Sequence, residues 1–150
     1  MRKLIVTGLA LSAACLSAGS ALAQSDEDKI EYRHAVFTVI GGNFGPMGDM
    51  VEGKSDYDPE IFARNAERVA QMSHMALEGF EGGPHTGETD AKDAIWDQWE
   101  KYQQGNDRFQ SAAQELAEAS SDEASLDEVR EPFMEVAESC KNCHDNFRND

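Results

Sequence analysis

Positive charge is scarce in this chain of 150 residues: 13 Lys and Arg stand against 29 Asp and Glu, which gives a formal net charge of −16. No basic run or patch interrupts the acidic excess. Nucleic acids and anionic membrane surfaces are therefore not expected as partners. An acidic surface keeps a protein soluble and would suit a basic partner protein.

Long apolar runs are also lacking. The apolar stretch from Leu4 to Leu16 is too short to span a membrane. It follows the positive Met1-Arg2-Lys3 and precedes an Ala-x-Ala site, as in a cleaved signal peptide. We therefore predict a signal peptide over residues 1–23, a single mature domain over 24–150, and a location in the periplasm. Cleavage would remove Cys15, although lipidation at this cysteine stays an open alternative.

No segment alternates with the period of a half-buried strand, whereas helical spacing of apolar residues recurs throughout. We expect a first helix from Ser25 or Asp26, with a kink or partial break at Gly41-Gly42 and Gly45-Pro46. Three further helices are predicted, which run from Asp58-Pro59 to about Ala76, from Thr89 or Asp90 to about Ala119, and onward from the capping box Ser125-x-x-Glu128. This pattern favours an all-α fold, an antiparallel up-down-up-down four-helix bundle.

Two of the three cysteines form the sequence Cys140-Lys141-Asn142-Cys143-His144, which is the pattern of covalent c-type haem attachment. On a helix these three side chains share one face, so two thiols could join one haem while the imidazole reaches its iron. The same pattern could be a redox pair or half of a zinc site. A zinc site would want a second ligand pair, which the scattered His34, His74 and His85 do not provide.

Neither methionine nor histidine follows His144, so a second iron ligand must come from upstream, or one iron position is open. His34 is one candidate, and others are Met47, Met50, Met72 and Met75, although methionines at helical spacing are more often flexible core. We expect His74 and His85 to face solvent.

The chain resembles the cytochrome c prime family, through Cys140-x-x-Cys143-His144-Asp145-x-Phe147-Arg148, Tyr32-Arg33-His34-x-x-Phe37 and Ile95-Trp96. The resemblance implies one haem c, attached to Cys140 and Cys143, with His144 as the sole axial ligand of a five-coordinate iron. It also implies that Phe37 closes the distal side, that Arg33 meets a haem propionate and that Arg148 lies near the proximal face. His34 and Asp90 are weaker candidates for the haem edge.

An apolar distal residue would select small uncharged ligands such as nitric oxide and carbon monoxide. We therefore expect a non-enzymatic cytochrome that binds these gases, with nitric oxide scavenging as one role, and that transfers electrons to a redox partner protein still to be identified. A six-coordinate electron carrier is the main alternative, and a peroxidase-like enzyme a weaker one, since the predicted distal residue cannot move protons. Relatives often pair through their first two helices, so a homodimer is a further expectation.

Overall fold

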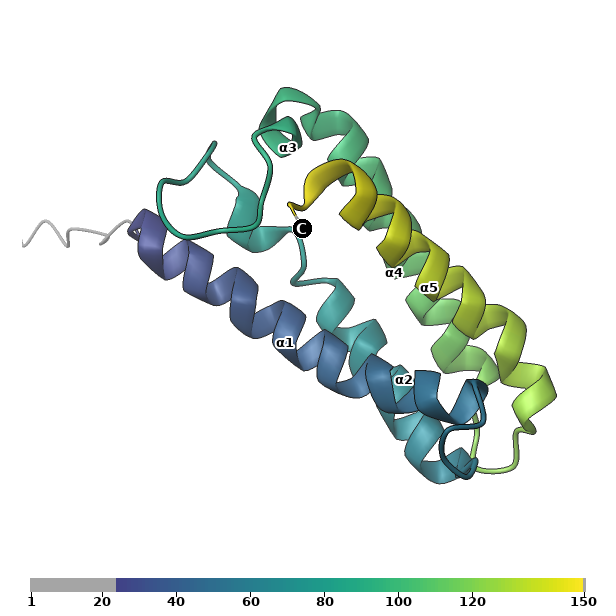
Figure 1. Ribbon diagram of the computed structural model, residues 1–150. Coiled ribbons are helices and arrows are strands. Elements are labelled where there is room, and N and C mark those ends of the chain that lie inside the picture. Colours follow the sequence, from purple (N-terminus) through teal and green to yellow (C-terminus); the bar gives the residue numbers. More distant parts are fainter. Residues whose placement is uncertain (1–23, 150) are drawn as a thin grey trace, which may run out of the picture.

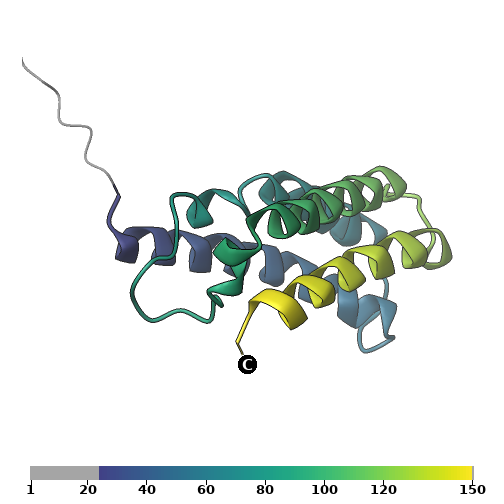
Figure 2. The same ribbon diagram turned by 90° about the horizontal axis from the view of Figure 1, so that it is seen from above.

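The computed structural model describes residues 24–149, so the predicted signal peptide and Cys15 lie outside the described residues. The elements in order are α1 (Asp26–Val51), α2 (Pro59–Ser73), the 3-10 helix η1 (Glu78–Phe80), α3 (Ala94–Asp97), α4 (Trp99–Ala119) and α5 (Leu126–Phe147). The four long helices pack as an antiparallel bundle, which confirms the predicted fold (Figures 1 and 2). Within residues 24–149, no helix combines the length and apolar character that crossing a membrane would take.

Two of the predicted helix starts show the capping contacts that the sequence suggested. The Asp58 carboxylate accepts a hydrogen bond from the backbone N–H of Ile61 at 3.0 Å, and Pro59 occupies the first helical position of α2. The Glu128 carboxylate accepts from the backbone N–H of Ser125 at 2.8 Å. These contacts satisfy backbone donors that have no partner within the helix, so they determine where α2 and α5 begin.

Of the two outcomes predicted for the first helix, a kink or a partial break, the partial break is wrong, because α1 runs without interruption through Pro46. Proline normally disfavours the helical conformation of the preceding residue through a clash with its Cβ. That residue is Gly45, which has no Cβ and so avoids this clash. One long helix can therefore form a complete wall of the bundle.

The predicted start of the third helix at Thr89 or Asp90 is also wrong, because residues 90–92 pair with the C-terminus instead. The Asn149 N–H donates to the Asp90 carbonyl at 2.7 Å, and the Lys92 N–H donates to the Phe147 carbonyl at 2.9 Å. Contact with a remote segment overrides the local capping signal here. The chain near Asp90 is thereby tied to the end of α5.

Two smaller corrections concern helix lengths. The single long third helix is divided into α3 and α4 at Gln98, whose backbone leaves the helical region (φ −125°, ψ 41°). The second helix ends at Ser73 rather than near Ala76, and a turn then leads into η1. This turn allows the chain to cross back over α1 before it reaches α3.

The core has two parts. The larger lies toward the α1–α2 turn and contains Phe62, which is completely buried. Stacked rings of Phe44 and Phe133, with centroids 4.5 Å apart, join α1 to α5 there. A smaller cluster around Phe80 and Tyr102 lies near the C-terminus of α5. Away from the Phe44–Phe133 pair, α1 and α5 diverge (Figure 1), and the cavity that holds the predicted site residues lies on this side.

Candidate haem site

A cavity of about 500 Å³ opens between α1, α4 and α5. This volume lies within the range usual for small-molecule and cofactor sites. All eight residues predicted for the site line it: Arg33, His34, Phe37, Asp90, Cys140, Cys143, His144 and Arg148. The fold thus brings together residues from both ends of the sequence.

The α5 wall carries the two thiols and the imidazole. Cys140 and Cys143 are both free and partly buried, and burial raises the pKa of each thiol. Partial burial, helped by the nearby Arg148, lowers the pKa of His144. The imidazole is therefore neutral at physiological pH, which is the form that binds metal ions. The α4 wall lies close by, since a Cβ added at Gly105 would be 3.9 Å from the Cys143 sulfur.

The α1 wall presents Arg33 and Phe37, which are one helical turn apart. The Phe37 ring packs edge-on against Phe80, with centroids 6.3 Å apart, and is 38% exposed. It borders the cavity and is not part of the closed core. His34 is exposed at the cavity margin, and a Cβ added at Gly41 would meet nothing within 4 Å.

Arg33 is buried against the loop that connects η1 to α3. Its guanidinium donates to the Thr89 hydroxyl at 3.2 Å, lies 3.3 Å from His85 Nδ1 and is stacked 4.6 Å above the Phe80 ring. Burial lowers the pKa of Arg33, but a guanidinium stays protonated in proteins. The expectation that His85 faces solvent is wrong, because this side chain is only 8% exposed.

Arg148 and Asp90 meet at the rim of the cavity, where their charged groups are 3.6 Å apart. Both side chains are largely exposed, so the ion pair itself contributes little to stability. The backbone pairing between residue 149 and Asp90 holds the two residues together more firmly.

Two further polar residues, Tyr102 and Asn106, line the cavity from α4 and were not predicted as site residues. The Tyr102 ring packs between Phe80 and Phe147, and burial raises the pKa of its hydroxyl, which therefore stays protonated. Asn106 is only 6% exposed. A sequence signal for it existed, since it is a polar residue on the apolar stripe between Tyr102 and Phe109.

The chemistry of these walls fits a haem. One wall offers two thiols and a neutral imidazole, one end offers a buried guanidinium for a carboxylate, and Gly41 and Gly105 leave room for a flat group. Among the described cavity-lining residues there is no methionine. Nor do residues 24–149 contain three His, Cys, Asp or Glu side chains grouped to hold a metal ion, as a zinc site would need.

Comparisons with known proteins agree with this geometry. The sequence model of a family described as Cytochrome C' matches residues 28–148. Cytochrome c' from Halomonas halodenitrificans is 38% identical over 127 residues, which cover 81% of this chain and 96% of the relative.

Solved structures are similar over the whole bundle. Cytochrome c prime from Shewanella frigidimarina aligns with a TM-score of 0.81 and 35% identity, over 85% of this chain and 99% of that one. A ferrous variant of cytochrome c prime from Alcaligenes xylosoxidans with bound NO gives a TM-score of 0.75 and 31% identity, over 85% and 98%. The chain described here belongs to the cytochrome c prime family of haem c proteins.

Proposed function

We propose that this cytochrome carries one haem, joined by thioether bonds to Cys140 and Cys143, and that His144 is its only axial ligand. In this state it binds small uncharged gases, nitric oxide and carbon monoxide, and takes part in one-electron transfer. We assign it no catalytic turnover. The bound haem would supply an iron that cycles between ferric and ferrous states and accepts a gas at an open position.

One observation carries the proposal. Among the described α1 residues that line the cavity, His34 is the only histidine, and none is a methionine. The four methionines considered from the sequence do not line the cavity, and Met47 is completely buried in the core. His34 is the one other histidine among the described cavity-lining residues, and it is exposed at the margin. A six-coordinate carrier would therefore depend on His34.

The chain's own side chains account for the choice of ligand. The phenyl ring of Phe37 cannot ligate iron, but it can exclude water and crowd a bulky molecule. An anion would gain no hydrogen bond from Phe37 and would lose its hydration. The similar structure from Alcaligenes xylosoxidans with bound NO supports nitric oxide as the ligand class.

The residues around the cavity would hold the haem in place. We propose that the buried Arg33 pairs with a haem propionate, because a charged hydrogen bond offsets the cost of its burial. Arg148 lies beside His144, where we place the proximal side, and its charge helps to keep the imidazole neutral. His34 and Asp90 would border the haem edge.

Export and partners complete the proposal. We propose that residues 1–23 are cleaved and that the mature protein, residues 24–150, works in the periplasm, where haem attachment to cysteine takes place. Its redox partner would be a protein with a basic docking surface, which would complement the net charge of −16. Pairing of two copies through α1 and α2 stays a prediction, which analytical ultracentrifugation would test.

The optical spectrum of the dithionite-reduced holoprotein, without added ligand, tests the proposal. A broad, unsplit visible band with a high-spin Soret band is expected for an open iron. Sharp, separate α and β bands would contradict the five-coordinate proposal. If these bands then disappeared in His34→Gln but not in His74→Gln, His34 would be the sixth ligand. A holoprotein without covalently bound haem would refute the roles of Cys140 and Cys143.

A further inference from the structure

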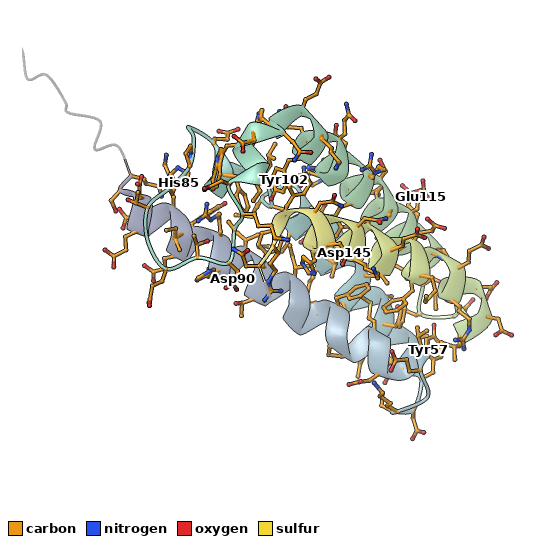
Figure 3. The ribbon with its side chains drawn as sticks, turned by 45° about the horizontal axis from the view of Figure 1, so that its top comes forward. Tyr57, His85, Asp90, Tyr102, Glu115 and Asp145 are labelled. Carbon is orange, nitrogen blue, oxygen red and sulfur yellow. The ribbon has the colours of Figure 1, made fainter. Side chains whose placement is uncertain are left out.

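A histidine outside the predicted site lies between two positive charges. His85 Nε2 is 3.2 Å from Lys29 Nζ, and its Nδ1 is 3.3 Å from a terminal nitrogen of Arg33. The imidazole packs edge-on against Trp96, with ring centroids 5.8 Å apart. Figure 3 marks His85 on the loop between η1 and α3, next to α1.

His85, Lys29 and Arg33 together have too few hydrogen-bond acceptors for their donors. A neutral imidazole has one donor and one acceptor, whereas a charged lysine and an arginine are donors only. Only one of the two ring contacts can therefore be a hydrogen bond. Lys29 has an alternative acceptor in the Glu81 carbonyl, at 3.3 Å. Since Arg33 is far more deeply buried, we infer that the imidazole accepts from Arg33.

No carboxylate of the described residues lies within ion-pair distance of these two charges. Among residues 24–149, neither Lys29 nor Arg33 forms an ion pair. Asp26, on the first turn of α1, is the acid that acts on His85, but its carboxylate accepts hydrogen bonds from the Thr86 N–H and hydroxyl, each at 3.0 Å. The imidazole thus faces Lys29, Arg33 and Asp26 from α1, the Glu81 backbone from its own loop and Trp96 from α3.

Protonation of the ring would change this arrangement. A protonated imidazole has two N–H groups and no acceptor, so it would repel the Arg33 guanidinium. Burial, Lys29 and Arg33 lower the pKa of His85, and Asp26 opposes them more weakly, so the ring is neutral near pH 7. The stem of Arg33 is closely confined as well, because a Cβ at Gly79 would clash with its Cγ.

We propose that His85 is a positioning residue for Arg33: the neutral ring holds the guanidinium at the cavity wall, and the protonated ring displaces it from the haem carboxylate. This inference rests on the proposed haem site. Its consequence is a midpoint potential that depends on pH through Arg33, since moving a positive charge near a haem changes the stability of the ferric form.

The test is spectroelectrochemical titration of the holoprotein from about pH 5 to pH 8, around the ordinary histidine pKa. The wild type should show a step in midpoint potential at a pH below that ordinary value. His85→Gln, which keeps an acceptor but does not titrate there, should lose the step. His74→Gln removes an exposed histidine just after the C-terminus of α2 and should keep the step.

The variant Arg33→Gln separates positioning from direct electrostatics. If His85 acts through Arg33, the step is lost in Arg33→Gln and adding His85→Gln changes nothing further. A step that persists in Arg33→Gln would overturn the proposal, because the charge of His85 would then act on the haem directly. A wild-type step unaffected by His85→Gln would overturn it too. Arg33→Met, which keeps a long side chain but carries no charge, serves if Arg33→Gln does not fold, and loss of the step is again expected. If the iron is six-coordinate, and the proposed function is therefore wrong, the optical spectrum will show it. The differences in midpoint potential between these variants test only the role of His85.

Discussion

Replacing Phe37 with alanine tests whether this ring controls entry of gases into the cavity. The ring borders the cavity and is held by its edge-on contact with Phe80, at 6.3 Å between centroids. A ligand that enters past Phe37 requires the ring to swing away, which breaks this aromatic contact. Alanine removes both the obstacle and the contact.

The size of the effect follows from that contact. An edge-on aromatic pair contributes about 0.5–1.5 kcal/mol beyond the area that it buries. If this energy is part of the entry barrier, its loss should speed association about 2- to 10-fold, since about 1.4 kcal/mol corresponds to a factor of ten. Because Phe37 is 38% exposed, the cost in unfolding free energy should be about 2 kcal/mol, below the value for a fully buried phenylalanine.

Stopped-flow association of carbon monoxide and of nitric oxide with the reduced holoprotein measures the entry rate. Val39→Ala is the matched control, because Val39 lies on the same helix but is 44% exposed and does not line the cavity. Its rates should equal those of the wild type. If Phe37→Ala also leaves both rates unchanged while the spectrum stays high-spin, Phe37 is not the distal gate.

Three further predictions concern the scaffold. Phe62→Ala should lower the unfolding free energy by about 3–5 kcal/mol in urea titrations, since this ring is completely buried. Gly79→Ala should lower the melting temperature and shift the midpoint potential, because the added Cβ would displace Arg33; an unchanged potential would contradict this reasoning. The hydrogen bonds from Ser125 lower the pKa of Glu128, so their stabilisation is present above the ordinary pKa of 4.5 and is lost as the pH falls through the lower folded-state value. Glu128→Gln should reduce the loss of stability on acidification in thermal melts, and an identical pH dependence would refute this role.

Local sequence signals predicted the structure correctly where the contacts that stabilise a segment lie within that segment. Asp58-Pro59 and Ser125-x-x-Glu128 determine helix starts because capping satisfies backbone donors within one turn. The partial break expected at Gly45-Pro46 was wrong, since the glycine that weakens the helix also removes the clash with the proline. The helix start expected near Asp90 was wrong because residues 147–149, remote in sequence, take its backbone hydrogen bonds.

The sequence by itself determined the helical content and the helical spacing of the apolar residues. It also identified Cys140, Cys143 and His144 as one group, because residues three and four apart share a helix face. Only the tertiary structure decided what this group faces. The divergence of α1 from α5 opens the cavity, and the crossing of the η1–α3 loop buries His85 against Arg33. That loop has no apolar periodicity to indicate burial, so its contacts depend on packing between distant segments and not on any local pattern.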